Sequence, residues 1–399
     1  MRIAIIGAGV SGLSAAWFLK NEHTVTVFEK QEHFGGHANT STINYNGNEI
    51  NVDTGFIVFN YKTYYHLQRL FNNLGIDVVK SNMSFGVSNK EIEYSSVGPF
   101  ANKKNLFKLD YLKMLFEIMR FNRISKKTEL SIEESLEEYL NRFAFSKYFR
   151  RNYIYAMAGA IWSCTAEEAK QYPAKSFINF FKHHGLLQIT NHPQWYSVKG
   201  GSKEYVRKIM ECHEITFKKA CVFNVIKNGN SVQVTHKNGE ELFDSVIIAT
   251  HADEAFTLTN EETIKDFKYS KNIAILHKDS SLMPKNKQTW ASWNYVSNNT
   301  NNLCLTYWMN NLQPIKKSLP LFVTLNPTKE IKQEDIFYQT TYYHPIFNNM
   351  AHKIQERIQD IQGKNNIYYI GSYMGYGFHE DGIKSAYDTC STLVTKMPW

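Results

Sequence analysis

A glycine-rich segment close to the first residues of the chain could bind the diphosphate of a dinucleotide. Gly7-Ala8-Gly9-Val10-Ser11-Gly12 follows the apolar run Ile3–Ile6 and precedes Leu13–Leu19, a stretch rich in small residues. In a G-x-G-x-x-G pattern the first glycine permits a tight turn and the second lets the backbone approach a diphosphate. The third lets a helix pack closely on a strand. The predicted helix would also point its unpaired N–H groups and the positive end of its dipole at the phosphates.

An acidic residue stands where such a site needs a partner for a ribose. Thr24–Phe28 is predicted to be the second strand, and Glu29 ends it. A carboxylate in this place accepts hydrogen bonds from ribose hydroxyls and repels a 2′-phosphate, which disfavours NADP. The order strand, turn, helix, strand and acidic residue therefore predicts a dinucleotide site that includes Glu29 and the adjacent Lys30.

Five further segments carry a resemblance to a family of flavoenzymes. In this order they resemble the motifs of the flavin amine oxidase superfamily, which extends from amine oxidases to phytoene-type desaturases. The segments are Phe34-Gly35-Gly36-His37-Ala38-Asn39-Thr40, Val52-Asp53-Thr54-Gly55, Val222, Ile248-Ala249-Thr250, and Gly371 with Glu380-Asp381-Gly382 and Ser385-Ala386.

The resemblance implies that FAD is the cofactor. It places the segment Asp53–Gly55 beside the isoalloxazine and the backbone of Val222 at the adenine. It assigns Thr250 to the second strand of the nucleotide domain. Beyond Gly371, a helix that begins near Gly382 would face the flavin O2 with its N-terminus, where its dipole stabilises the negative charge of reduced flavin.

Longer segments throughout the chain resemble one subgroup, bacterial NAD/FAD-binding proteins of amine-oxidase type. This subgroup is often associated with cyclopropane-type fatty acid synthases, and some relatives are implicated in desaturating methyl-branched acyl chains. The resemblance therefore implies a lipid acyl substrate. The segments are 52–60, 160–163, 200–202, 282–284, 290–295, 306–310, 325–327 and 375–382.

The sequence departs from the amine oxidases at two positions. His37 replaces the arginine that usually follows the glycine pair, which alters one contact to the cofactor. His379 stands where the amine oxidases place a tyrosine, one wall of an aromatic cage over the flavin. The missing wall weakens the case for a plain amine substrate and puts a titratable group near the flavin. His379 is therefore the predicted catalytic residue, and a structural role in ordering its loop is the alternative.

Aromatic residues and cysteines give weaker predictions. Trp162, Trp293 and Tyr307 could line a substrate tunnel, although each taken singly also suits a core position. Cys164 has no His or Asp placed to activate it, and His344 is isolated, so both are expected to be structural. No spacing of His, Cys, Asp or Glu predicts a metal site.

Positive charge is concentrated in one stretch. The formal net charge is +8, and residues 103–127 hold eight basic side chains against Asp110 and Glu117, interleaved with apolar residues. A basic amphipathic helix of this kind can lie on an anionic membrane surface. The alternative is an ordinary surface helix whose apolar side packs inward. Nucleic-acid binding is not expected because no recognised module accompanies the charge.

The pattern of elements predicts an α/β fold with two interleaved domains. Strand-rich nucleotide-type segments at 1–85, 200–260 and 350–399 would form a Rossmann-type, glutathione-reductase-like FAD-binding domain. Residues 86–199 and 261–349 would form an α+β substrate domain laid over it. The mainly helical part of the second domain is expected to include a helix capped by Ser131 and Glu134.

These features together predict an FAD-dependent oxidoreductase that abstracts hydride from a substrate C–H bond, with an acyl chain as the favoured substrate. An amine or amino-acid oxidase and a flavin-dependent double-bond isomerase remain alternatives, as does a lipid- or protein-binding module on a flavin fold. Five scattered cysteines and the absence of a secretory leader pattern favour a reduced, cytoplasmic protein, with attachment to the inner membrane face as a further expectation. The electron acceptor, a use of NAD(P)H and the oligomeric state stay open.

Overall fold

The computed structural model describes residues 1–131, 133–188, 192–297 and 304–399. Its nucleotide-binding half is built on a parallel sheet whose strands come from widely separated parts of the chain. Ile3, Ala4 and Ile5 in the central strand are fully buried, as expected for a parallel sheet covered on both faces. The strand order is β10 (Ile215–Lys219), β2 (Thr24–Glu29), β1 (Arg2–Ile6), β14 (Ser245–Ile248) and β20 (Ile367–Tyr369).

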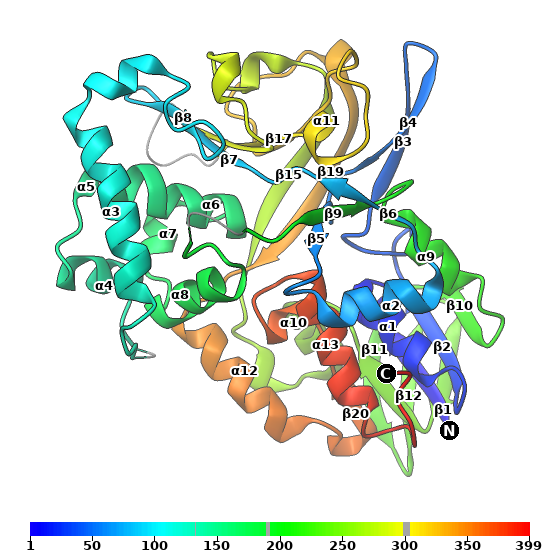
Figure 1. Ribbon diagram of the computed structural model, residues 1–399. Helices are drawn as coiled ribbons and strands as arrows, with labels where there is room; N and C mark the ends of the chain where they lie inside the picture. Colours follow the sequence, from blue (N-terminus) through cyan, green and yellow to red (C-terminus); the bar gives the residue numbers. More distant parts are fainter. Residues whose placement is uncertain (132, 189–191, 298–303) are drawn as a thin grey trace.

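Two helices meet with their N-termini at the carboxyl ends of these strands. They are α1 (Val10–Leu19) and α13 (His379–Cys390), which lie against each other in Figure 1. The approach is close, because a Cβ added to Gly382 would lie 2.7 Å from the Ser11 hydroxyl oxygen. Helices α2 (Tyr65–Leu74) and α9 (Lys203–Met210) pack beside this pair.

An antiparallel sheet and two further helices complete this half. The sheet consists of β11 (Val222–Asn228), β12 (Ser231–His236) and β13 (Gly239–Phe243). It contacts α10 (Ala252–Thr259), and α12 (Asn349–Ile361) precedes β20.

A seven-stranded mixed sheet forms the second half, at the top of Figure 1. Its only parallel pair among the described residues is β16 with β7. The predicted boundary between residues 85 and 86 falls inside this sheet, because Phe85 is the first residue of β7. The order is β19 (Ile336–Pro345), β15 (Tyr269–His277), β18 (Phe322–Leu325), β17 (Leu305–Trp308), β16 (Trp293–Val296), β7 (Phe85–Ser88) and β8 (Glu93–Ser95).

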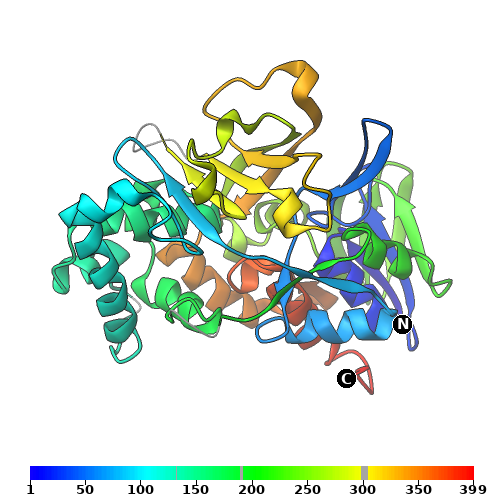
Figure 2. The same ribbon diagram turned by 45° about the horizontal axis from the view of Figure 1, so that its top comes forward.

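A helical lobe flanks this sheet at the side of the molecule far from the two termini (Figures 1 and 2). It contains the 3₁₀ helix η1 (Lys103–Phe107), α3 (Leu109–Ser125), α4 (Leu136–Arg142), α5 (Lys147–Phe149), the π-helical turn η2 (Arg150–Tyr155), α6 (Ala156–Trp162), α7 (Ala166–Lys170) and α8 (Ala174–His183). No helix among the described residues is both long and apolar enough to span a lipid bilayer.

The predicted helix cap at Ser131 and Glu134 is wrong by one turn. The capping box is made by Ser135 and Glu138, and α4 begins at Leu136. The backbone N–H of Leu136 donates to the carbonyl of Tyr172 at 2.7 Å, which fixes the start of the helix from outside.

Two small sheets connect the halves. Strands β3 (Thr40–Tyr45) and β4 (Asn48–Asp53) form a hairpin. Strands β5 (Phe59–Asn60), β9 (Trp195–Val198) and β6 (Val78–Ser81) form the other sheet, whose flanking chain crosses the middle of the molecule in Figure 2.

Candidate active site

The glycine-rich turn has the geometry of a diphosphate cradle. Gly7 adopts a φ of 105°, which favours glycine. A Cβ on Gly9 would meet no atom within 4 Å, so the backbone there faces open space. A Cβ on Gly12 would lie 1.9 Å from the carbonyl oxygen of Gly7. The three glycines therefore differ in purpose, and Gly9 is the one that leaves room for a ligand at the N-terminus of α1.

The second glycine pair, Gly35 and Gly36, packs against the backbone of this turn. The backbone N–H of Gly35 donates to the carbonyl of Ala8 at 2.8 Å. A Cβ on Gly36 would lie 3.1 Å from the Cα of Gly9, and Gly36 has a φ of 58°. A larger residue at Gly36 would push the backbone of Gly9 out of its position.

Glu29 ends β2 beside the cradle and is held in place by two backbone groups. The N–H of Ala8 donates to one carboxylate oxygen and the N–H of Gln31 to the other, each at 2.8 Å. Each carboxylate oxygen keeps lone-pair capacity for a further donor, such as a ribose hydroxyl. Lys30 forms an ion pair with Glu254 of α10 next to it.

A single cavity of about 1750 Å³ begins at this cradle and extends beneath the seven-stranded sheet and the helical lobe. Ligand pockets commonly measure roughly 300–1,000 Å³, so this one has room for a dinucleotide and a second molecule. The predicted site residues that line it are Gly7, Gly9, Val10, Ser11, Glu29, Lys30, Gly36, His37, Gly55, Val222, Thr250, Gly371, Trp162, Trp293, Tyr307 and His379.

The remaining predicted cofactor residues do not line the cavity. Gly12 and Gly35 let a neighbouring backbone carbonyl approach closely, and Gly382 makes room for the side chains of Ser11 and Val10. Asp53 is buried, and its carboxylate accepts hydrogen bonds from Thr40, Ser202 and Gln313 at 2.6 to 3.0 Å. Burial raises the pKa of Asp53 to about 6. The residues outside the lining are Gly12, Gly35, Ala38, Asp53, Thr54, Glu380, Asp381 and Gly382.

Glu380 and Asp381 organise the chain around the start of α13. Glu380 accepts the backbone N–H groups of His66 and Leu67 at 2.8 and 3.0 Å, which satisfies the first turn of α2. Asp381 accepts the N–H groups of Tyr376 and Phe378, which fixes the preceding loop. Burial raises the pKa of Glu380 to about 7 and that of Asp381 to about 6.

His379 lies at the first position of α13 with its ring between two aromatic partners. It stacks on Phe56 with ring centres 3.9 Å apart, and its Nε2 lies 3.2 Å from the hydroxyl of Tyr205. Burial lowers the pKa of His379 to about 3. At neutral pH the side chain is therefore an uncharged hydrogen-bonding group and a weak proton acceptor.

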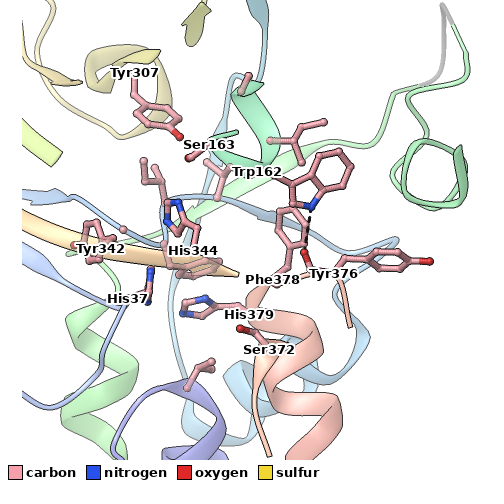
Figure 3. A pocket seen from close by; sticks show the side chains of 18 of the residues that line it. His37, Trp162, Ser163, Tyr307, Tyr342, His344, Ser372, Tyr376, Phe378 and His379 are labelled. Carbon is pink, nitrogen blue, oxygen red and sulfur yellow. Dashed lines mark hydrogen bonds between the residues drawn. The ribbon is translucent and has the colours of Figure 1, made fainter. Parts of the chain in front are cut away.

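Two further histidines, neither of them among the predicted site residues, lie near His37. Its ring stacks on Tyr342 at 4.7 Å and lies 5.6 Å from His344 and 6.4 Å from His251. Figure 3 shows His37, His344 and His379 around the same part of the cavity. Burial and the neighbouring histidines hold the pKa of His37 well below its usual value.

His344 was expected to be isolated and structural, whereas it lines the cavity within this cluster. The side-chain amide of Asn272 donates to its Nδ1 at 3.2 Å, and burial lowers its pKa to about 4. One signal for it was available, since Thr340, Tyr342 and His344 alternate along β19 and so share a face. Their contact with His37 and His251 depends on the tertiary fold.

Aromatic rings form the opposite wall of the cavity. Trp162 packs on Phe180 with ring centres 4.9 Å apart, and Phe180 stacks on Phe378 at 5.0 Å. The indole N–H of Trp162 donates to the carbonyl of Tyr376, the dashed line in Figure 3. Further along, Trp293 and Tyr307 meet edge to face at 5.4 Å.

The charge of the lining is uneven. Among the described residues, its carboxylates are Glu29 and Glu254, which both lie at the nucleotide end. The part between the histidine cluster and α3 is lined by apolar and aromatic side chains such as Leu115, Ile118 and Met157, together with uncharged polar ones such as Ser95 and Asn122. This end suits an apolar ligand better than a cationic one.

Comparisons with known proteins agree with this architecture. The model of the NAD(P)-binding Rossmann-like domain matches residues 5–74. No curated protein sequence matches the chain.

Three solved structures share the fold along almost their whole length. A CLA-producing fatty acid isomerase from P. acnes has a TM-score of 0.73 and 14% identity, covering 99% of both chains. A putrescine oxidase bound to putrescine has a TM-score of 0.70 and 14% identity, with 99% of this chain and 100% of the other covered. Cyclohexylamine oxidase from Brevibacterium oxydans has a TM-score of 0.68 and 13% identity, with 98% and 99% covered. The predicted fold class is confirmed: the chain is an α/β protein with a Rossmann-like nucleotide-binding domain, and it shares its fold with the solved structures of two amine oxidases and a fatty acid isomerase.

Proposed function

We propose that this protein is an FAD-dependent oxidoreductase that removes hydride from a C–H bond of a lipid acyl chain. The observation that carries the proposal is the continuity of the cavity, which joins a dinucleotide cradle to an apolar, aromatic-walled space. A redox cofactor bound at one end would thus lie in the same enclosure as a substrate bound at the other.

The residues of the cradle fit FAD. The open space at Gly9 and the free N–H groups at the start of α1 suit its diphosphate, and Glu29 suits a ribose. Val222 and Thr250 line the same end of the cavity and suit the adenine side. Bound FAD would supply an acceptor for the hydride, the chemistry that no side chain of the protein provides.

The chain's own residues would hold the substrate and keep the site uncharged. The neutral rings of His37 and His344, on one side, face a cavity whose other wall is aromatic. His379 is proposed as the catalytic residue, acting as a neutral hydrogen-bonding group that Tyr205 and Phe56 hold in one orientation. Trp162, Trp293 and Tyr307 are proposed to contact the acyl chain.

Charge separates the acyl chain from the alternative substrate, an amine. A cationic amine would lack a carboxylate partner at the substrate end among the described lining residues, because Glu29 and Glu254 belong to the nucleotide end. The fold shared with a fatty acid isomerase supports an acyl substrate, and the fold shared with two amine oxidases keeps the amine as the second candidate.

Product analysis tests the proposal and its alternatives. The purified protein is incubated with bacterial phospholipid in air. The acyl chains are then released, and their masses are measured by mass spectrometry. Chains that have lost a pair of hydrogen atoms support the dehydrogenase. Chains of unchanged mass with a displaced double bond would identify an isomerase, and unchanged lipid together with oxidation of added amines would replace the proposal with an amine oxidase.

A further inference from the structure

The outer face of α3 exposes large apolar side chains. Residues three and four apart share one side of a helix, and Leu109, Leu112, Phe116 and Met119 follow this spacing. Leu109 is 83% exposed, Phe116 60% and Met119 49%. Phe107, at the end of η1, is 88% exposed next to them. These side chains are additional to the apolar residues that α3 packs inward, such as Tyr111 and Phe121.

Basic side chains surround this apolar face. Lys113 and Arg123 lie on the same side of α3, Lys103 and Lys104 precede it, and Lys126 and Lys127 follow it. The ion pairs formed by the described residues include none of these six.

The acidic residues of this stretch leave the positive charge unbalanced. The carboxylate of Glu117 is buried and accepts the backbone N–H of Ser146 at 2.8 Å. Asp110 is the remaining acidic residue between Lys103 and Lys127, and it is exposed. Six exposed cations thus face solvent around the apolar face, with one carboxylate among them.

The cavity reaches the surface beside this face. The inner side of α3 contributes Leu115, Ile118 and Asn122 to the cavity lining. Val97 and Met119 also line the cavity, and they are 64% and 49% exposed. Tyr153 and Met157 of the neighbouring helical segment line the same passage, which continues to Trp162.

We infer that the face formed by η1 and α3 docks on an anionic lipid bilayer and that the cavity opens toward the bilayer at Val97 and Met119. Exposed Phe and Leu side chains mixed with Lys and Arg match the two layers of a membrane surface, an anionic headgroup layer above an apolar interior. The docking follows from this face alone, whereas its use for acyl chains rests on the proposed function.

Vesicle co-sedimentation tests the docking. Wild-type protein is mixed with vesicles of phosphatidylcholine containing phosphatidylglycerol, or with vesicles of phosphatidylcholine alone. We expect binding to the anionic vesicles, weakened by salt because the headgroup attraction is electrostatic. The variant Lys103→Glu/Lys104→Glu/Lys126→Glu/Lys127→Glu and the variant Phe107→Ser/Leu109→Ser/Phe116→Ser should each lower the binding constant by at least about tenfold.

Matched controls lie on the antiparallel sheet of the nucleotide-binding half. Phe223→Ser/Leu242→Ser removes apolar side chains that are 56% and 48% exposed, and Lys227→Glu/Lys237→Glu reverses exposed charges. Both controls should bind vesicles as the wild type does. Failure of the wild type to bind anionic vesicles, or equal loss in the controls, would overturn the docking inference.

A second readout separates the docking from the substrate. Flavin reduction is followed with phospholipid in vesicles and with the same lipid dispersed in detergent. If the acyl proposal holds, the η1–α3 variants lose reduction by vesicles and keep reduction by dispersed lipid. If neither form of lipid reduces the wild type while the variants still lose vesicle binding, the docking stands and the proposed function fails.

Discussion

Gly9 and Gly12 both belong to the glycine-rich segment at the start of α1, yet the structure gives them opposite surroundings. Gly9 faces open space at a φ of −72°, which any residue can adopt, so only a ligand requires its small size. Gly12 is pressed against the carbonyl of Gly7, so the fold itself requires its small size. The sequence motif predicted a glycine at both positions, but it placed Gly12 in the turn before the helix, whereas α1 begins at Val10 and includes Gly12.

The variants Gly9→Val and Gly12→Val should therefore fail in different ways. Gly9→Val should fold with a melting temperature close to that of the wild type and retain little or no FAD. Gly12→Val should lose about 1–3 kcal/mol of folding free energy through overpacking. Cofactor content by absorbance and urea unfolding distinguish them. A Gly9→Val protein that retains FAD fully would contradict the placement of the diphosphate.

His379 should make the folding stability of the protein depend on pH. Its pKa is about 3 in the folded protein, below the ordinary value near 6.5. The unfolded chain therefore binds a proton that the folded chain resists. The stability contributed by the neutral ring is complete above pH 6.5 and is lost as the pH falls.

Replacing His379 by Phe should remove this dependence. Between pH 7 and pH 5, the free energy of unfolding of His379→Phe should rise relative to the wild type by about 2 kcal/mol. The variant should keep FAD, and its reduction by substrate should slow by a large factor. Parallel pH profiles of stability would show that His379 is not held neutral, and unchanged reduction kinetics would assign it a structural role only.

For helices and strands, sequence patterns predicted the elements whose positions depend on neighbouring residues in the chain. The first strand, helix and second strand were expected at Ile3–Ile6, Leu13–Leu19 and Thr24–Phe28, and β1, α1 and β2 include these segments. The helix cap failed because Ser131-Ile132-Glu133-Glu134-Ser135-Leu136-Glu137-Glu138 contains two overlapping candidates for a capping box. A contact with Tyr172, distant in sequence, selects the second one.

Glu380 was predicted to bind the cofactor, whereas in the structure its carboxylate caps the start of a helix. Its carboxylate serves as the N-terminal partner of α2, a helix without a side-chain cap of its own. We expect Glu380→Ala to lower the free energy of unfolding by about 1–2 kcal/mol, and Glu380→Gln to cost less because its amide oxygen can still accept one N–H. Urea unfolding measures both, and equal stability of the three proteins would contradict the capping role.

For the whole molecule, the sequence could indicate the nucleotide domain and single cavity-lining residues such as Trp162 and Tyr307, but not which side chains meet inside the cavity. His37, His251 and His344 come from three segments separated by many elements, and no local pattern announces that they meet. The basic helix is a related case. The sequence shows that α3 mixes basic and apolar residues. Which of its apolar residues face solvent depends on which ones the helical lobe buries.

In the proposed reaction, electrons pass from an acyl chain to a flavin held in this cavity. The most direct measurement is the visible spectrum of the purified protein under anaerobic conditions, with bacterial phospholipid added to one sample and mixed amines to another. We expect a flavin spectrum that bleaches with phospholipid and persists with amines. A flavin bleached by amines alone, or a colourless protein that does not take up FAD, would contradict it.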